Sequence, residues 1–225
     1  MNPIIITLDG FSSCGKSTLA RQLANELNYV FIDSGAMYRA ITLYFIRQQV
    51  DRSSAAAIHE ALSEISLDFR YNAHSRESDI YLNDENVAAQ IRDMLVSENV
   101  SEVATLKEVR EFAVAQQQKM GEKKGLVMDG RDIGTTVFPN AELKIFVTAD
   151  PAVRVARRFK ELYERNPNIT VEEVKNNLEM RDYTDSNREF SPLRKAEDAV
   201  ILDNTDLTRE EQLELALKWA RERMV

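Results

Sequence analysis

An eight-residue segment near the N-terminus has the residue types and the spacing of a phosphate-binding loop. Residues 10–17 read Gly-Phe-Ser-Ser-Cys-Gly-Lys-Ser and match the pattern G-x-x-x-x-G-K-[ST]. Glycines in such a loop permit backbone angles that direct several N–H groups at one anion. The ammonium group of Lys16 would face the β- and γ-phosphates, and the hydroxyl of Ser17 is a suitable ligand for Mg²⁺. We therefore expect a nucleotide such as ATP to bind at Gly10, Phe11, Ser12, Ser13, Cys14, Gly15, Lys16, Ser17 and Thr18.

The segments on either side of this loop support the same prediction. Residues 4–8 form a short apolar run that is typical of a buried strand, although a buried helix segment can have the same composition. After Lys16, apolar residues recur at helical spacing, and the N-terminus of that helix would add its positive dipole end to the anion site. A glycine-containing turn with a chance lysine is disfavoured, because the pattern occurs in full between a strand and a helix.

The rest of the chain alternates between apolar strands and helices. Asp150-Pro151 is a good helix start, and capping boxes begin at Thr170 and Thr208. Strands that are buried on both faces read as continuous apolar runs, so we expect an α/β fold with a parallel sheet of about five strands and helices on both sides. Ligands of such sheets bind beyond the carboxyl ends of the strands. Further strands are expected at residues 29–32, 125–129, 143–147 and 199–202.

The middle of the chain has a different pattern. Residues 67–71 and 80–82 have the composition of strands, and the polar stretch 72–78 between them predicts a hairpin with a long loop. A charged segment with helical features follows from residue 88 to residue 120. This order indicates a small lobe that is inserted into the α/β chain.

Arginines near the expected strand ends favour a kinase over other nucleotide-binding proteins. The sequence has no guanine-reading Asn-Lys-x-Asp segment, which a GTPase switch needs, and the strand before Asp129 does not end in the adjacent acidic residues usual for a motor ATPase. An acceptor that is itself a phosphate monoester needs guanidinium groups around it, since arginine binds phosphate with a planar, permanently charged fork. The candidates are Arg39, Arg110, Arg131, Arg157, Arg158, Arg181 and Arg188.

Any single arginine is more often a solvated surface residue. Arg131 departs most from that expectation, because it follows a buried strand within Asp-Gly-Arg-Asp. Arg181, Asp185 and Arg188 have the spacing i, i+4, i+7, which would place them on one face of a continuous helix. That spacing fits a ladder of ion pairs within the helix as well as it fits a binding surface, so both interpretations stay open.

Composition and charge limit the class of protein. The chain has 225 residues and a formal net charge of −8, whereas proteins that bind nucleic acid polymers non-specifically are usually basic. Its single cysteine permits no intrachain disulfide, which fits a reducing compartment. The N-terminal residues lack a basic region and a long apolar stretch, so we expect a cytoplasmic protein without a membrane partner.

Taken together, these segments resemble bacterial cytidylate kinases, which belong to the P-loop nucleoside monophosphate kinases. The resemblance covers nearly the whole chain, and the order and spacing of its segments are far more specific than the phosphate-binding loop alone. It implies an enzyme, expected to be a monomer, that transfers the γ-phosphoryl group of ATP to CMP or dCMP with the help of Mg²⁺. The segments that carry it are residues 10–18, 33–39, 109–111, 129–135, 137–139, 181–185 and 187–188.

The resemblance also implies three parts and a set of acceptor contacts. The parts are a core of residues 1–61 and 101–225, an acceptor-binding lobe of residues 62–100, and a lid near 153–168. Lys16 and the arginines of the clamp and lid would stabilise the transferring phosphoryl group. The acceptor phosphate would contact Ser34, Tyr38, Arg39, Arg131 and Arg188. The ribose would contact Arg181 and Asp185, and the cytosine Ser101, Arg110 and Asp132, in a pocket that Asp129 and Gly130 also line. The lid would contribute Arg157 and Arg158.

The proposed base contacts predict a preference for CMP over UMP. Arg110 can donate to N3 and O2 of cytosine, and Asp132 and Ser101 can accept from its amine. Uracil has a carbonyl where cytosine has the amine, so Asp132 would face another acceptor. A site built on hydrogen bonds rejects such a mismatch, because buried polar groups lose their partners.

Two residues of the loop depart from the common pattern of the family, and one further residue has two possible roles. Phe11 stands where proline is usual and Cys14 where alanine is usual, but backbone amides do the binding, so activity should survive. Cys14 is expected to be a small inert filler, with an oxidation-sensitive thiol as the alternative. Asp33 is either an outer-shell partner of Mg²⁺ or a helix N-cap.

Two rival functions use the same phosphate-binding loop. One is a P-loop kinase for another small acceptor, such as UMP, AMP or shikimate, with a different acceptor pocket. The other is a non-catalytic ATP-binding regulatory domain. The arginine set argues against the second, since a nucleotide sensor has no need of a second phosphate clamp.

Overall fold

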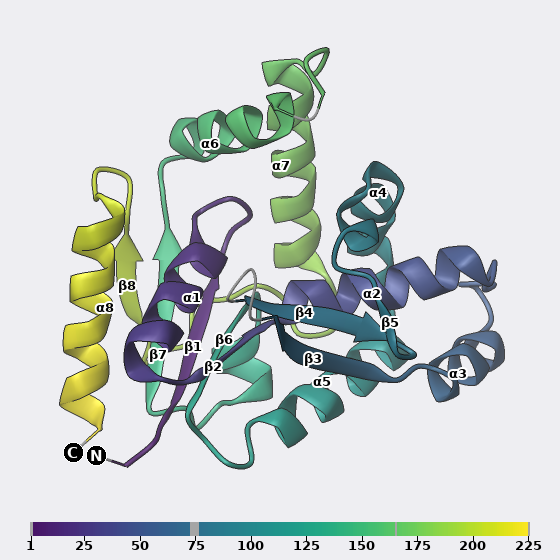
Figure 1. Ribbon diagram of the computed structural model, residues 1–225. Helices are drawn as coiled ribbons and strands as arrows, with labels where there is room; N and C mark the ends of the chain where they lie inside the picture. The colour runs from purple at the N-terminus through teal and green to yellow at the C-terminus, as the bar shows by residue number, and fades with distance from the viewer. Residues whose placement is uncertain (1, 73–76, 165, 225) are drawn as a thin grey trace. The chain divides into compact units, whose positions relative to one another are not determined.

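The chain forms two compact units in the computed structural model, which describes residues 2–72, 77–164 and 166–224. The first unit comprises residues 1–31 and 123–225, and the second comprises residues 32–122. The first unit carries a five-stranded sheet in the order β2-β6-β1-β7-β8 (Figure 1). The chain passes from the first unit into the second within β2 (Val30–Asp33).

The sheet is parallel along its central strands, as the sequence predicts. The central strand β1 (Ile5–Gly10) pairs in parallel with β6 (Leu126–Gly130) on one side and with β7 (Leu143–Thr148) on the other. In these pairings Asp9 lies opposite Gly130. The edge strand β8 (Val200–Asp203) continues the sheet in parallel beside β7. The carboxyl ends of β1 and β6 therefore lie at the same edge, where the motifs of residues 10–17 and 129–132 begin.

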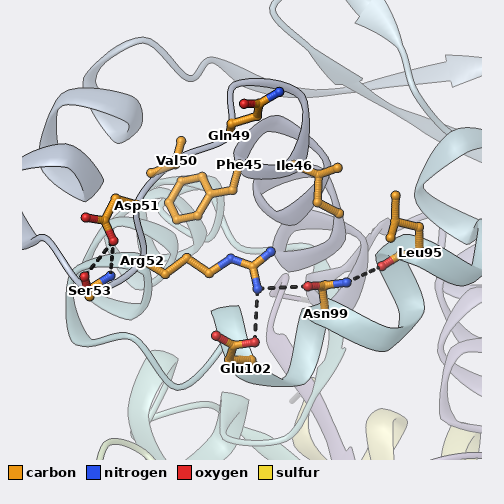
Figure 2. A pocket seen from close by; sticks show the side chains of 10 residues that line it. All are labelled: Phe45, Ile46, Gln49, Val50, Asp51, Arg52, Ser53, Leu95, Asn99 and Glu102. Carbon is orange, nitrogen blue, oxygen red and sulfur yellow. Dashed lines mark hydrogen bonds and ion pairs between the residues drawn. The ribbon is translucent and has the colours of Figure 1, made fainter.

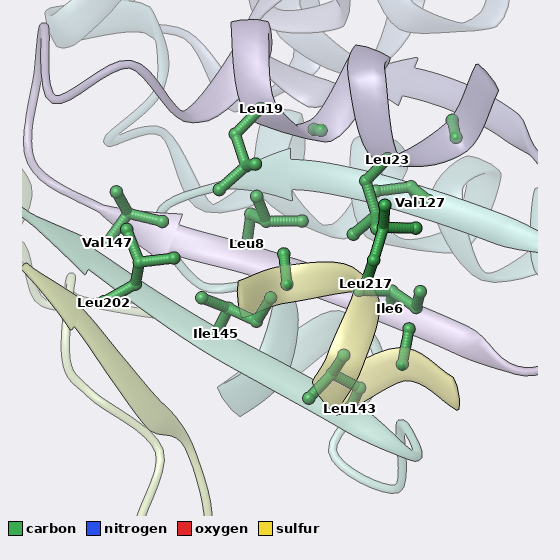
Figure 3. Close-up of a cluster of buried hydrophobic side chains, with 14 of the residues drawn as sticks. Ile6, Leu8, Leu19, Leu23, Val127, Leu143, Ile145, Val147, Leu202 and Leu217 are labelled. Carbon is green, nitrogen blue, oxygen red and sulfur yellow. The ribbon is translucent and has the colours of Figure 1, made fainter. Parts of the chain in front are cut away.

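A layer of two helices covers one face of this sheet. The helices α1 (Lys16–Leu27) and α8 (Arg209–Arg223) supply Leu19, Leu23 and Leu217 to a buried cluster that includes Ile6 and Leu8 of β1 (Figure 3). All of these leucine and isoleucine side chains are buried. Burying an aliphatic side chain of this size contributes roughly 1.5–3 kcal/mol, so the packing holds the start of α1 firmly against the sheet.

Two further helices of the first unit begin as the sequence predicts. In α6 (Pro151–Tyr163) the Asp150 carboxylate accepts from the amide of Ala152 at 2.7 Å. In α7 (Val171–Asn187) Thr170 and Glu173 form a reciprocal capping box, and Thr208 and Glu211 form the same motif in front of α8. The helix α7 ends just before Arg188, which is its C-cap and has an extended backbone (φ −62°, ψ 146°), so Arg181 and Asp185 lie on the helix and Arg188 follows it.

The second unit combines helices with a small antiparallel sheet. The predicted hairpin is confirmed as β3 (Leu67–Asn72) paired with β4 (Glu77–Leu82), and β5 (Glu85–Asn86) adds a short third strand. Residues 73–76 of its loop lie outside the described residues. The expected single helical segment 88–120 is divided into three, because Asp93 (ψ 152°) and Leu106 (ψ 126°) are extended. The helices of this unit are α2 (Ser34–Arg47), α3 (Ala55–Ser63), the 3₁₀ turn η1 (Gln90–Arg92), α4 (Met94–Val103) and α5 (Lys107–Met120).

The predicted lobe of residues 62–100 lies within the second unit, which also contains α2 and α5. The boundaries of this lobe and of the lid at 153–168 stay predictions. Among the described residues, none of the helices combines the length and the apolar character needed to cross a bilayer.

Candidate active site

The phosphate-binding loop, residues 10–18, connects β1 to α1 as predicted. Gly15 stands at the N-cap of α1 in the left-handed region (φ 86°, ψ 8°), which a residue with a side chain rarely adopts. Lys16 is only 5% exposed, and its ammonium group donates to the carbonyl of Phe11 at 2.6 Å. Burial, followed by the positive charge of Arg131, lowers the pKa of Lys16. The loop thus holds a buried cation beside the positive N-terminus of a helix, which is the arrangement that binds polyphosphates.

Gly10 is required at the start of this loop by the close approach of β7. Its φ is +146°, and a Cβ atom there would lie 2.0 Å from the carbonyl oxygen of Val147. We expect Gly10→Ala to lower the free energy of unfolding by about 1–3 kcal/mol, because the strand must shift to make room. Urea unfolding measures this loss. Gly125→Ala is the matched control: its φ is also positive, but the nearest atom would be 3.8 Å away. Equal losses in the two variants would contradict the steric argument.

The two unusual residues of the loop have packing partners in the first unit. The Phe11 ring meets Phe146 edge-on with centroids 6.0 Å apart, and the guanidinium carbon of Arg154 lies 5.2 Å from the Phe11 centroid. The side chain of Cys14 is fully buried, and its thiol donates to the Phe11 carbonyl at 3.0 Å. Phe11 is therefore held by an aromatic and a cationic contact, and the burial of Cys14 fits the role of a small filler.

Two predicted arginines share a carboxylate beyond the end of β6. The Nε of Arg131 donates to Asp185 at 2.8 Å, and one of its terminal nitrogens donates to the hydroxyl of Ser12 at 2.8 Å. Arg188 donates to Asp132 at 3.2 Å and lies 3.8 Å from Asp185. Asp185 thus pairs with Arg131, which lies outside α7, so its contacts are not limited to a ladder of ion pairs within the helix. We call these four residues, Arg131, Asp132, Asp185 and Arg188, the arginine–carboxylate cluster.

The protonation of this cluster follows from burial and charge together. Burial alone would raise the pKa of Asp185, but the positive charges of Arg131 and Arg188 outweigh it and lower the pKa. Burial alone would lower the pKa of Arg131, and the nearby Asp185 carboxylate raises it instead. Arg131 and Asp185 thus stabilise each other in their charged forms, and the two guanidinium groups of the cluster are held by carboxylates.

Ser17 and Asp129 provide a donor set that suits Mg²⁺. The Ser17 hydroxyl donates to the Asp129 carboxylate at 2.7 Å, so the two oxygens lie side by side at the end of β6. Hard divalent cations prefer such oxygen ligands, and Mg²⁺ is usually held by one or two protein oxygens together with substrate phosphates. The sequence predicts Asp129 as part of the acceptor pocket, but its contact with Ser17 places it at the predicted metal side of the loop.

Contacts from α6 and α7 to the loop involve residues that the sequence did not single out. Asp182 accepts from the Ser12 amide at 3.1 Å and from Arg154 at 2.5 Å, and Arg154 also donates to the Ser12 carbonyl. The predicted lid arginines have other partners here: Arg157 donates to Asn204, and Arg158 donates to Glu161. No local pattern identifies Asp182, because its partner Ser12 is 170 residues away.

Arg181 lies on α7 of the first unit, and the other remaining predicted acceptor residues belong to the second unit. Asp33 caps α2 by accepting from the amide of Ala36 at 2.9 Å, and it pairs with Arg39 at 2.9 Å. The guanidinium carbon of Arg110 lies 5.3 Å from the centroid of the Tyr38 ring, and its NH1 donates to the carbonyl of Ala104. The N-cap role of Asp33 is thus confirmed, while its outer-shell role stays a prediction. Ser34 lies on α2 and Ser101 on α4.

A hollow of about 750 Å³ on the second unit contains none of the predicted site residues. It is lined by the C-terminal part of α2, the following turn and α4 (Figure 2). Arg52 crosses it and donates to Asn99 at 2.9 Å and to Glu102 at 3.0 Å. The Arg52 guanidinium group therefore has its polar partners within this hollow, away from the predicted site residues.

Solved structures support the fold. A putative kinase from Chloroflexus aurantiacus superimposes with a TM-score of 0.50 at 16% sequence identity, covering 100% of both chains. An uncharacterized protein from Eubacterium ventriosum superimposes with a TM-score of 0.52 at 13% identity, covering 99% of this chain and 100% of the other. At such low identities the likeness concerns the arrangement of strands and helices alone.

Sequence comparison is far more specific. The chain is 54% identical over 217 residues to a protein of Bacteroides thetaiotaomicron named cytidylate kinase, with 95% of both chains covered. It is 50% identical over 225 residues to a cytidylate kinase of Cytophaga hutchinsonii, with 100% of this chain and 96% of the relative covered. The family model described as cytidylate kinase matches residues 6–222. This chain belongs to the cytidylate kinase family.

Proposed function

We propose that this protein transfers the γ-phosphoryl group of ATP to CMP or dCMP and releases ADP with CDP or dCDP. The observation that carries the proposal is family membership over residues 6–222 together with the arginine–carboxylate cluster beside the phosphate-binding loop. Such a transfer brings two polyanions together, so positive charge must surround the migrating group. Arg131 satisfies this need directly, because it contacts Ser12 of the loop.

The donor half of the reaction uses the phosphate-binding loop. Backbone amides of residues 10–18 and the ammonium group of Lys16 hold the ATP phosphates. Ser17 binds Mg²⁺, with Asp129 and Asp33 proposed as partners of its bound waters. The metal, when bound, neutralises charge on the β- and γ-phosphates. The Ser12 amide is used by Asp182 in this structure, so binding of a phosphate at that amide requires Asp182 to release it.

Guanidinium and hydroxyl groups are proposed to supply the acceptor half of the reaction. Arg39, Arg131 and Arg188, with Ser34 and Tyr38, are proposed to bind the phosphate of CMP. An oxygen of that dianion attacks the γ-phosphorus directly, so the protein need not supply a base. Arg157 and Arg158 are proposed to close over the transferring group and exclude water, which would otherwise hydrolyse ATP.

The nucleoside of the acceptor is proposed to bind through paired polar groups. Arg181 and Asp185 contact the ribose, while Ser101, Arg110 and Asp132 contact the cytosine, with Gly130 beside them. Two of these groups, Arg110 and Asp132, are each only 3% exposed. A base that leaves them unmatched is rejected, since an unsatisfied buried polar group costs about 1–3 kcal/mol.

A coupled assay of ADP release with CMP, dCMP, UMP, AMP, GMP and shikimate as acceptors tests the proposal. We expect the highest kcat/KM with CMP and dCMP, and a value about 10–100-fold lower with UMP, because one buried hydrogen-bonding group is then unmatched. A higher value with AMP or shikimate would identify another small-molecule kinase. ATP binding without any acceptor-dependent ADP release would indicate a regulatory domain.

Asp132 is the residue on which the preference for cytosine should depend. We expect Asp132→Asn to lower kcat/KM for CMP and to raise it for UMP, because an amide can donate to the uracil carbonyl. The ratio of the two kcat/KM values measures the effect. Asp51→Asn is a suitable control, since Asp51 accepts from the amide of Ser53 on the exposed surface of the second unit. An unchanged CMP/UMP ratio in Asp132→Asn would remove Asp132 from base recognition.

A further inference from the structure

A buried carboxylate on β1 contacts the segment that follows the arginine-bearing turn of β6. Asp9 is 5% exposed, and its two oxygens accept from the amides of Ile133 and Gly134, each at 2.7 Å. These are the first two amides of η2 (Ile133–Val137), a single turn of π-helix. Short π-helical segments are rare and occur frequently at functional sites. A side chain from a strand 124 residues away thus performs the capping of this turn.

The residue that would ordinarily cap η2 makes a different contact. Asp132 occupies the N-cap position, and an aspartate there usually accepts from amides two or three residues ahead. Its backbone (φ −143°, ψ 23°) is not the extended N-cap conformation. The Asp132 carboxylate instead accepts from Arg188 at 3.2 Å, with both side chains only 4% exposed. Asp9 therefore caps η2, while Asp132 is left to pair with Arg188; one aspartate could not make both contacts at once.

The packing around Asp9 leaves little freedom for another arrangement. A Cβ atom on Gly134 would lie 2.8 Å from the hydroxyl oxygen of Thr7 and 3.2 Å from the Asp9 carboxylate. Burial raises the pKa of Asp9 to about 6, against the lowering effect of the two amide bonds; the Asp132 carboxylate raises this pKa and the Lys16 ammonium lowers it. The two amide bonds favour the ionised form of Asp9, which burial alone would disfavour.

We propose that Asp9 is a positioning residue for base recognition: by capping η2 it keeps the carboxylate of Asp132 turned toward Arg188 and the acceptor nucleoside. This inference rests on the proposed function, in which Asp132 reads the cytosine amine. Without Asp9, the amides of Ile133 and Gly134 lose their acceptor, and Asp132 at the N-cap position is placed to accept from Gly134, two residues ahead. Asp132 would then rotate into the cap and leave the base unmatched.

Asp9→Asn is the variant that separates this role from a general structural one. Its single side-chain oxygen can accept from one amide, while its NH₂ group would face the other N–H. We expect kcat/KM for CMP to fall by about 10²-fold, as for a catalytic or binding group displaced by an ångström. The loss for UMP should be much smaller, so that the CMP/UMP preference collapses, while KM for ATP stays close to that of the parent enzyme. Equal losses for CMP and UMP would overturn the proposal.

A double-mutant cycle with Asp132→Asn sharpens the test. If Asp9 acts through Asp132, then adding Asp9→Asn to Asp132→Asn should change kcat/KM for CMP by less than about twofold, whereas independent sites add their effects. A full additive loss would overturn the proposal. Gly134→Ala, which crowds the same contact from the other side, should lower the CMP/UMP ratio in the same way. A ratio like that of the parent enzyme in a folded Gly134→Ala protein would count against it.

A crystal structure of Asp9→Asn supplies a readout that does not depend on the reaction. We expect the Asp132 carboxylate to have moved from Arg188 to the amide of Gly134. Asp132 still paired with Arg188 in that structure would refute the positioning role, even if activity had fallen. Failure of the proposed function would be seen separately, as the absence of a CMP preference in the unsubstituted enzyme. Asp51→Asn serves again as the matched carboxylate control.

Discussion

Arg131→Ala should lower the turnover number by about 10³-fold or more, the range seen when an arginine that stabilises a transferring phosphoryl group is removed. Arg131 is held in place from both ends, by Asp185 at 2.8 Å and by the Ser12 hydroxyl of the phosphate-binding loop at 2.8 Å. Its charge is therefore fixed beside the phosphate-binding loop. Charge that is already oriented needs no reorganisation in the transition state, which is why its loss should affect kcat most.

Steady-state kinetics and ATP titration together check this expectation. The dissociation constant for ATP should change little, because the amides of the loop and Lys16 remain. Arg131→Lys should give an intermediate rate, since it keeps the charge but loses the planar fork that meets Asp185 and Ser12 together. Arg52→Ala is the matched control, because Arg52 lies in the hollow of Figure 2, among none of the predicted site residues. A turnover number within tenfold of the parent enzyme would remove Arg131 from the catalytic role.

Arg188→Met should lower the free energy of unfolding by about 3–5 kcal/mol, the usual cost of leaving a buried charge without its partner. The Arg188 side chain is 4% exposed and contacts two carboxylates, Asp132 at 3.2 Å and Asp185 at 3.8 Å. It also donates to the carbonyl of Ser191 at 2.8 Å. Methionine fills a similar volume, so the loss would come from the Asp132 carboxylate and the Ser191 carbonyl, which lose the Arg188 guanidinium group, with little contribution from a cavity.

Urea unfolding of Arg188→Met and of a surface control measures this loss. Arg158→Met removes an arginine whose partner, Glu161, is 56% exposed, and it should cost less than about 1 kcal/mol. Adding Asp132→Asn to Arg188→Met should recover part of the stability, because the carboxylate that loses the Arg188 charge is then replaced by a neutral amide. If Arg188→Met were no less stable than Arg158→Met, the arginine–carboxylate cluster would contribute nothing to the fold.

Local sequence patterns predict the parts of the site that are built from adjacent residues. The strand, loop and helix around residues 10–18 follow from apolar periodicity and glycine spacing, and both capping boxes begin where Ser/Thr-x-x-Glu patterns place them. No capping or glycine pattern in the sequence predicts the break between α4 and α5. It depends on the extended backbone of Leu106, a residue whose type alone does not end a helix.

The contacts that orient the site could not be predicted, because they join residues far apart in the chain. Asp9 reads in the sequence as the last polar residue of a strand, and only the parallel register with β6 brings it to the first amides of η2. Arg154 lies on the same helix as the predicted lid arginines. Only the folded structure shows that Arg154 contacts the Ser12 carbonyl directly and also pairs with Asp182 of α7. A sequence motif predicts which residues bind a ligand. The residues that position them through long-range contacts follow only from the topology of the fold.

The buried amide of Asn204 has a consequence for how this protein matures during synthesis. Asn204 is 1% exposed; its NH₂ group donates to the carbonyl of Cys14 at 2.8 Å, 190 residues earlier in the chain, and to Gln212 on α8. Chains emerge from the ribosome N-terminus first, so the phosphate-binding loop is synthesised well before Asn204, which supports it. A nascent chain therefore cannot form this contact with the loop until the segment around residues 204–212 has emerged and folded against it.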